Sequence, residues 1–257
     1  MSITRPLILL TNDDGIHAEG LRRLQQAVSE LGDIVISAPE SQQSAVGHSI
    51  TLYDPIRVHE ISVDGSFYGY GISGTPADAV KLAVQALLPR RPDVVLSGIN
   101  NGANLGFNVL YSGTVSAATE AAILNVPGLA FSFAQKKDPP FRWAVPHVTR
   151  LTKWILEKGL PPGVALSVNI PALPPEEVKG YKLTRQGISG TRDIYDRRED
   201  PRGNLYFWLT EENPPHEVDQ NVDMVALNRG YVSVTPLFND LTAHSKKEIL
   251  AESLEGL

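Results

Sequence analysis

Residues 7–20 read LILLTNDDGIHAEG, and this stretch decides the fold of the chain. The four apolar residues Leu7–Leu10 show no polar alternation, which is typical of a strand covered on both faces in a parallel sheet. Apolar residues at helical spacing follow the glycine at position 15, namely Leu21, Leu24, Val28 and Leu31. The stretch therefore predicts a strand, a sharp turn and a helix, which together begin an α/β fold.

Two adjacent carboxylates, Asp13 and Asp14, stand at the predicted end of this first strand. The carboxyl ends of strands are where open α/β sheets bind ligands. Side chains alternate faces along a strand, so both carboxylates reach one site only if the strand ends there, which Gly15 permits. A hard divalent cation would keep two such neighbours ionised. The alternative is a solvated Asp13 beside an ordinary Asp-Gly turn, and these residues alone leave both interpretations open.

The bulk composition excludes several classes of protein. The chain has 257 residues, of which 42% are hydrophobic and 20% charged, as in one large or two small globular domains. It has no cysteine, which excludes disulfides, thiolate metal sites and cysteine nucleophiles. A net charge of −6 argues against nucleic-acid polymers as partners. No signal peptide and no run of about 20 apolar residues is found, so we expect a cytoplasmic protein without membrane association.

Strands and helices alternate in the first half of the chain. The strands are expected at Ile34–Ser37, Ile56–Ile61, Phe67–Ile72, Asp93–Ser97 and Gly128–Phe133. One helix starts at Thr75-Pro76, where threonine can cap and proline suits the first turn. A second helix starts near Ser112 and runs through Ile123, and a third covers residues 143–158.

The character of the sequence changes after about residue 160. Strand-like pieces alternate with loops rich in proline and charge, at Ala165–Ile170, Leu205–Leu209 and Tyr231–Val234. The stretch Arg185–Arg202 mixes five arginines with four acidic residues. It is predicted to be a solvated loop or an extended arm, in preference to a phosphate-binding patch.

Further polar clusters follow other predicted strands. Ser44 and Asn100 offer neutral oxygens, which with two carboxylates make an all-oxygen shell suited to Mg²⁺, Mn²⁺ or Ca²⁺. Ser112, Gly113 and Thr114 open a helix and can bind an anion, although a plain helix cap would use the same residues. A metal site beside an anion site of phosphate size indicates metal-assisted phosphoryl hydrolysis.

Several motifs occur together in a fixed order between residue 7 and about residue 245. They are NDDGI (12–16), QS (43–44), GTPAD (74–78), SGIN (97–100), GANLG (102–106), YSGTV (111–115), GYVSVTPL (230–237) and DLT (240–242). The set closely resembles the SurE (survival protein E) nucleotidases. The resemblance implies a divalent-metal phosphatase acting on nucleoside 5′- and 3′-monophosphates, with short polyphosphates as a further substrate.

The resemblance also assigns the site residues. Asp13 and Asp14 would be catalytic, and the ligands of one divalent cation per subunit would be Asp13, Asp14, Ser44 and Asn100. The phosphate would be held by Asn104, Ser112, Gly113 and Thr114. Two positions depart from the family pattern, because Ala45 and Ala121 stand where glycine is usual. Neither departure removes an oxygen ligand.

The implied fold is a three-layer α/β/α, Rossmann-like core with a mixed sheet, a projecting β-hairpin arm and a C-terminal segment exchanged between subunits. Residues 1–257 would form a single domain, with a nucleotide- and metal-binding core at 1–160. Residues 161–257 would be an elaboration that carries the oligomerisation arm and tail. The expected assembly is a homodimer or homotetramer.

A water activated by an aspartate is the expected nucleophile. Phosphatases of the haloacid-dehalogenase type, which attack with an aspartate, separate their two aspartates by one residue, whereas Asp13 and Asp14 are adjacent. His17 and His48 come nearest to a general acid, but neither is convincingly placed. Two rivals remain: a dinucleotide-dependent oxidoreductase, disfavoured because the first turn lacks G-x-G-x-x-G, and a non-catalytic nucleotide- or metal-binding module.

Overall fold

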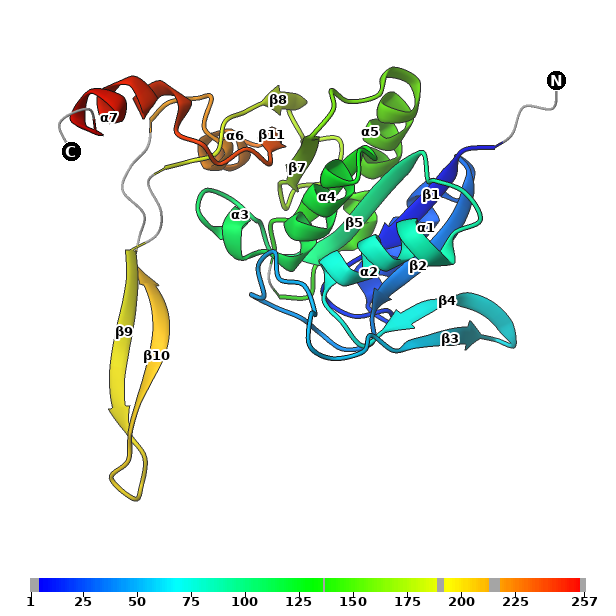
Figure 1. Ribbon diagram of the computed structural model, residues 1–257, viewed down its shortest axis with the longest axis horizontal. Helices are drawn as coiled ribbons and strands as arrows, with labels where there is room; N and C mark the ends of the chain where they lie inside the picture. The colour runs from blue at the N-terminus through cyan, green and yellow to red at the C-terminus, as the bar shows by residue number, and fades with distance from the viewer. Residues whose placement is uncertain (1–4, 136, 189–191, 213–217, 255–257) are drawn as a thin grey trace.

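The computed structural model describes residues 5–135, 137–188, 192–212 and 218–254 (Figure 1). Its strands are β1 (Leu7–Thr11), β2 (Asp33–Pro39), β3 (Val58–Val63), β4 (Ser66–Ile72), β5 (Val94–Asn101), β6 (Gly128–Phe133), β7 (Val164–Ile170), β8 (Tyr181–Leu183), β9 (Arg192–Glu199), β10 (Leu205–Glu212) and β11 (Val232–Phe238). Its helices are α1 (Glu19–Val28), α2 (Pro76–Leu82), α3 (Asn108–Tyr111), α4 (Gly113–Ile123), α5 (Val145–Lys158), α6 (Asp223–Asn228) and α7 (Lys247–Leu254). Shorter helical turns are η1 (Ala83–Leu87), η2 (Phe141–Trp143) and η3 (His244–Lys246).

A nine-stranded mixed sheet forms the centre, in the order β3-β4-β2-β1-β5-β6-β7-β11-β8. The six strands β4, β2, β1, β5, β6 and β7 are parallel to one another. Antiparallel pairs are added outside them, since β3 pairs with β4 and β11 pairs with β7. The predicted α/β class with a mixed sheet is therefore confirmed.

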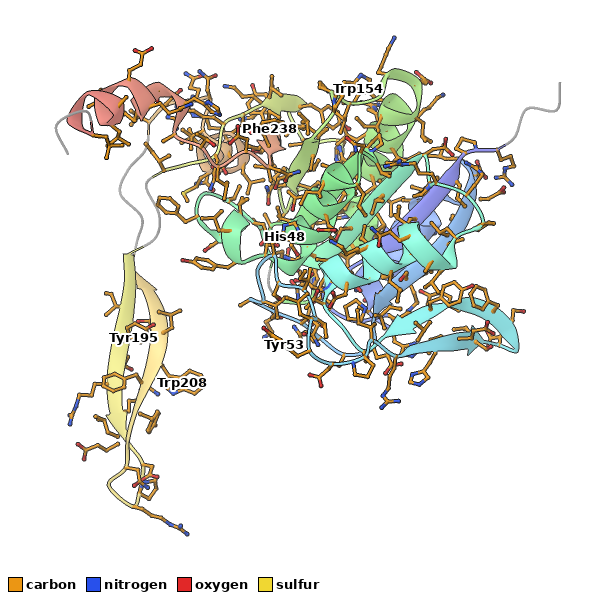
Figure 2. All side chains as sticks on the ribbon, in the orientation of Figure 1. His48, Tyr53, Trp154, Tyr195, Trp208 and Phe238 are labelled. Carbon is orange, nitrogen blue, oxygen red and sulfur yellow. The ribbon has the colours of Figure 1, made fainter. Side chains whose placement is uncertain are left out.

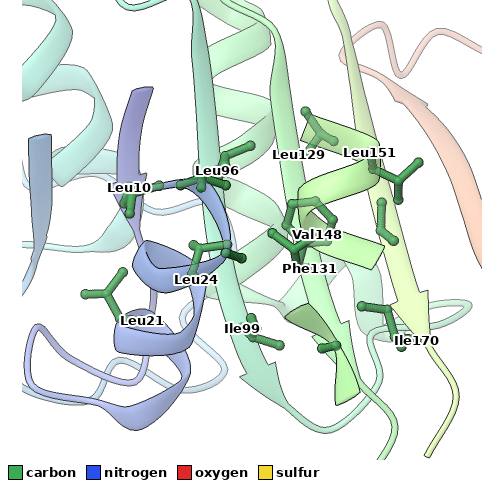
Figure 3. Packing of buried hydrophobic residues seen from close by; sticks show 14 of the residues in the cluster. Leu10, Leu21, Leu24, Leu96, Ile99, Leu129, Phe131, Val148, Leu151 and Ile170 are labelled. Atoms are coloured by element: carbon green, nitrogen blue, oxygen red, sulfur yellow. The ribbon is translucent and has the colours of Figure 1, made fainter. Parts of the chain in front are cut away.

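Helices cover both faces of the sheet, which makes three layers. On one face, Leu21 and Leu24 of α1, Val148 of α5 and Phe131 of β6 belong to one buried cluster (Figure 3). Each such side chain, fully buried, contributes about 1.5–3 kcal/mol to the free energy of folding. On the other face α2 and α4 pack against each other and on the sheet through small and β-branched residues, including Val80, Ala117 and Ala121.

The start of α2 follows its sequence signature. Thr75 Oγ1 accepts the N–H of Asp78 (3.1 Å), the Asp78 carboxylate accepts the N–H of Thr75 (3.0 Å), and Pro76 occupies the first turn. This reciprocal capping satisfies two N–H groups that no helical carbonyl can reach. The helix start predicted at Thr75 is confirmed.

Strand β11 extends past its predicted end. The sequence indicated a strand at Tyr231–Val234, whereas β11 continues through Pro236 to Phe238 and pairs with β7 along that length. On its other side β11 pairs with β8 only over Val232–Val234. Beyond Val234 that side is a sheet edge, where a proline without an N–H group is tolerated.

The stretch Arg185–Arg202 contains strand β9, which pairs with β10 in a separate two-stranded sheet. Figure 1 shows this hairpin projecting far from the body of the molecule. The prediction of an extended arm is confirmed, and the alternative of a solvated loop is wrong for Arg192–Glu199. No helix within the described residues is long and apolar enough to cross a membrane.

Candidate functional site

The candidate site lies where the strand order of the sheet reverses. From β1 the chain goes first to β2 on one side and later to β5, β6 and β7 on the other side. Such a switch point leaves a crevice at the carboxyl ends of the two central strands, here β1 and β5. Thr11 pairs with Ser97 across these strands, so Asp13 and Asn100 emerge at the same edge.

Asp13 joins three parts of the chain. Its side chain is buried, and the hydroxyl of Thr114 in α4 donates a hydrogen bond to its Oδ1. Its backbone oxygen accepts the N–H of Gln43 (2.7 Å), the residue before Ser44. A Cβ built on Gly113 would lie 2.7 Å from the Asp13 Cβ, so only glycine lets α4 approach this closely. The structure thereby brings Asp13, Gly113 and Thr114 together.

Asp14 and Asn100 face the same edge with defined partners. The Asp14 carboxylate interacts with the backbone N–H of Asn101, which follows Asn100. The Asn100 side-chain nitrogen donates to Gly102 O (2.8 Å), which leaves its Oδ1 as the atom that can bind a cation.

Burial shifts both aspartates towards protonation when no metal is bound. Desolvation raises the pKa of Asp13 to about 6, and the charge of Asp14 adds to the rise, while the Thr114 hydrogen bond opposes it. Desolvation also raises the pKa of Asp14, partly offset by the Asn101 N–H. A bound cation reverses this preference, because it favours the ionised form of both carboxylates.

The donor atoms at this edge fit a hard divalent cation. No group of three histidine, aspartate or glutamate side chains in the described ranges is placed to hold a metal ion. The groups present at this edge are two carboxylates and neutral oxygens, which Mg²⁺, Mn²⁺ and Ca²⁺ accept as ligands. Three buried oxygens also find no partner among the residues that the structure describes: Thr11 Oγ1 and Asn12 Oδ1 at the end of β1, and Ser97 Oγ of β5, which pairs with Thr11.

Ser44 lies on an exposed loop after β2. Its Oγ accepts a hydrogen bond from Gln42 Nε2 (2.8 Å), and its neighbour Gln43 is tied to Asp13. Ala45 adopts a φ of 56°. This left-handed conformation costs an L-residue about 1–2 kcal/mol, and glycine avoids the cost.

We expect Ala45→Gly to stabilise the protein by about 0.5 kcal/mol, because relief of the left-handed strain exceeds the entropy that glycine gains on unfolding. We expect Ala45→Val to destabilise it by about 1 kcal/mol, since a β-branched residue tolerates this conformation least. Urea unfolding midpoints measure both changes. Equal midpoints for the two variants would show that the backbone at position 45 is not strained.

The start of α4 uses its polar side chains within the protein. Ser112 Oγ accepts the N–H of Val115 (3.1 Å) and caps the helix, and Thr114 is engaged by Asp13. The groups left for an anion are the backbone N–H groups of the first turn, which have no partner within the helix. The helix-cap interpretation is therefore correct for the Ser112 side chain, and it is compatible with an anion site at the backbone.

Asn104 is held by two residues that the sequence analysis did not single out. Its N–H donates to Asn169 Oδ1 (2.8 Å), and its side-chain nitrogen donates to Ser132 Oγ (2.9 Å). Its carbonyl accepts from Asn169 Nδ2 (3.0 Å). Ser132 and Asn169 each interrupt a buried apolar strand, and that interruption is the signal that could have identified them.

Of the two histidines considered above, His48 is engaged by side chains of α4 and His17 is exposed. His48 Nε2 pairs with Glu120 Oε2 (2.8 Å) and its Nδ1 with Thr119 Oγ1 (3.1 Å), more than a turn beyond the start of α4 (Figure 2). The ring also lines an apolar cavity of about 330 Å³. His17 is exposed after the Asp-Asp-Gly turn.

The raised pKa of Asp13 predicts how the stability of the metal-free protein depends on pH. Its folded pKa of about 6 exceeds the unfolded value of 3.8, so the free energy of unfolding falls as the pH rises between these values. Asp13→Asn removes this penalty, and we expect it to stabilise the metal-free protein at pH 7.5 by about 1–3 kcal/mol. At pH 4 the difference should nearly vanish. Chemical unfolding with EDTA at both pH values measures it, and an equal difference at both would contradict the assignment.

The chain is similar to several known proteins. Residues 8–193 match the family model described as "Survival protein SurE". The chain is 48% identical to "5′-nucleotidase SurE" of Syntrophobacter fumaroxidans, over 95% of this chain and 98% of that protein. It is 45% identical to the protein of the same name in Syntrophus aciditrophicus, over 97% of this chain and 91% of that protein. The crystal structure of the SurE protein from Aquifex aeolicus superposes with a TM-score of 0.86 at 39% identity, covering 97% of this chain and all of that one.

Proposed function

The chain belongs to the SurE family, and we propose that it hydrolyses nucleoside 5′-monophosphates at the carboxyl edge of its sheet, with a divalent cation held by Asp13, Asp14, Ser44 and Asn100. It is a 5′-nucleotidase and therefore a hydrolase. Membership of the family implies a divalent metal ion and a nucleotide substrate. The contact of Asp13 with Thr114 carries the proposal, because it joins the carboxylate pair to the anion-binding start of α4.

The residues of the site divide the work of hydrolysis. A bound divalent cation would polarise the phosphoryl group and neutralise charge that develops on it. The N–H groups of Gly113 and Thr114, with the Asn104 amide, would hold the remaining phosphoryl oxygens. One aspartate would take a proton from the attacking water while the water oxygen forms its bond to phosphorus. The bond from phosphorus to the sugar oxygen then breaks, and solvent supplies the proton that the departing hydroxyl needs.

Phosphate release from a panel of substrates tests the proposal. EDTA-treated protein would be assayed with nucleoside 5′-monophosphates, 3′-monophosphates and short polyphosphates, with Mg²⁺, Mn²⁺, Ca²⁺ or no metal added. We expect turnover of the 5′-monophosphates only when metal is present. We further propose activity on 3′-monophosphates and short polyphosphates, since the described contacts recognise the phosphoryl group itself. Many turnovers without metal would contradict the metal site, and no release by folded protein would favour a binding module.

We also propose that the chain forms a homo-oligomer through its arm and C-terminal tail, both within residues 161–257. The arm exposes aromatic side chains on both of its faces, with Tyr195 66% and Trp208 59% exposed (Figure 2). The tail exposes Leu241, Ile249 and Leu250. Contiguous exposed apolar side chains of this kind mark interaction surfaces, and a second copy of the chain would bury them.

Replacing Phe207 and Trp208 together by serine should reduce the molecular mass in solution to that of a smaller assembly, because the pair supplies much of the apolar area of the arm. Sedimentation equilibrium or light scattering measures the mass. Trp154→Ser, at an exposed position of α5 outside the arm, is the matched control and should leave the mass unchanged. A double variant with the wild-type mass would exclude the arm as an interface.

A further inference from the structure

The loop that carries Ser44 is tied down at several points. It follows β2 and runs as irregular chain over residues 40–57, with Ser44 exposed near its beginning. The N–H of Gln43 donates to Asp13 O (2.7 Å), and the N–H of Gly47 donates to Tyr111 O (3.0 Å) at the end of α3. Between these two hydrogen bonds Ala45 adopts a left-handed conformation. The short segment between Gln43 and Gly47 therefore depends on the hydrogen bonds on either side of it.

Two buried carboxylates, one on α2 and one on α4, anchor the next part of the loop. Asp78 of α2 accepts both the N–H of Thr51 (3.0 Å) and its hydroxyl (2.6 Å). Glu120 of α4 accepts His48 Nε2 at 2.8 Å and Lys81 Nζ at 2.9 Å. The Thr75 hydroxyl adds a bond to Ser49 O (2.7 Å).

The Glu120 carboxylate is the anchor that is contacted by two basic side chains, His48 and Lys81. Its side chain is 3% exposed, while His48 and Lys81 are 33% and 39% exposed. Desolvation acts to raise the pKa of Glu120, but the hydrogen bonds from His48 and Lys81 outweigh it and leave this pKa below its ordinary value. Removing one partner of a buried, ionised group is costly, so the bond to His48 holds the loop firmly.

Glu120 also lies on α4, the helix whose first turn forms the proposed anion site. Gly113 and Thr114 form the first turn of α4, and Glu120 follows on the same helix less than two turns later. A rigid helix therefore links the Thr114–Asp13 contact to the His48 anchor of the loop. This arrangement fixes the loop relative to both the carboxylates and the start of α4.

We propose that Glu120 is a positioning residue of the metal site, which acts through His48 to hold Ser44 beside Asp13. The inference rests on the proposed function, because it takes Ser44 as a metal ligand. Partners that orient a ligand without touching the metal typically affect metal affinity by about 10–100-fold. Glu120 touches neither substrate nor metal in this scheme, and its effect is on the geometry of the shell.

Direct Mn²⁺ binding to metal-free protein, by calorimetry or electron paramagnetic resonance, tests the inference without catalysis. Glu120→Gln and His48→Ala should each weaken Mn²⁺ binding about tenfold, and the double variant should be no weaker than either, because both break one link. At saturating Mn²⁺ their kcat should stay within about threefold of wild type. Lys81→Met is the matched control, since it removes the other partner of Glu120 but none on the loop. We expect its Mn²⁺ affinity to be unchanged.

The outcomes separate this inference from the proposed function. Wild-type affinity in both Glu120→Gln and His48→Ala, with binding lost in Asp13→Asn, would overturn the positioning role and leave the metal site intact. Binding that survives Asp13→Asn would overturn both. An equal loss in Lys81→Met would show a general structural effect and would also overturn the inference. His48 lies on the exposed loop, so its variant remains informative if Glu120→Gln unfolds.

Discussion

Asp13→Asn is expected to lower the turnover of a nucleoside 5′-monophosphate by at least about 10³-fold at a Mn²⁺ concentration that saturates the wild-type protein, a rise of roughly 4 kcal/mol in the activation barrier. The amide oxygen can still accept the Thr114 hydrogen bond, so the local fold should persist. The variant loses the negative charge that favours cation binding, and it loses a base that can accept a proton from water. Steady-state phosphate release, with unfolding curves to verify the fold, measures the change.

Asp33→Asn is the matched control for this prediction. Asp33 begins β2 and is paired with Arg5 at 3.5 Å on the exposed surface, with more than half of its side chain accessible. It changes the net charge of the protein by the same amount and should leave kcat within about twofold, because exposed pairs contribute little. Near-normal turnover of Asp13→Asn, with metal supplied, would refute the assignment of Asp13 as a ligand.

Gly113→Ala should lower kcat/KM about 10²-fold by a steric route, without removing any polar group. The added Cβ would lie 2.7 Å from the Asp13 Cβ and 3.1 Å from its Oδ2, so either α4 or the aspartate must shift. A displacement of about 1 Å at a reacting centre costs on the order of 10²-fold in rate. Gly113 does not adopt a positive φ, so its backbone accommodates alanine and the effect reports the contact alone.

Two further variants support the interpretation of Gly113→Ala. Thr114→Ser keeps the hydroxyl that donates to Asp13 and should retain most activity, whereas Thr114→Val removes it. Gly65→Ala, in the turn between β3 and β4, adds a Cβ that meets nothing within 4 Å and should not affect kcat/KM. Wild-type kcat/KM in Gly113→Ala would show that α4 is not held against Asp13 as described.

The candidate site could be predicted from sequence because its residues stand at or just after the ends of predicted strands. Asp13 follows the apolar strand β1 and Asn100 lies at the end of β5, two strands that were recognisable by their composition, and parallel strands deliver their carboxyl ends to one edge. The long-range supports had no such marker. Asn104 is held by Asn169, 65 residues away, through a contact that no local pattern encodes.

Local patterns of this chain determined the elements: the unbroken apolar run of β1, the spacing of α1, and the proline and capping residues of α2. These signals act between residues a few positions apart, so they can be read without the fold. Tertiary structure alone decided which polar groups meet. Thr114 reaches Asp13 across 101 residues and His48 reaches Glu120 across 72, because the packing of α2 and α4 on one face of the sheet places them there. The same packing desolvates Asp13 and raises its pKa, a property that no stretch of sequence carries by itself.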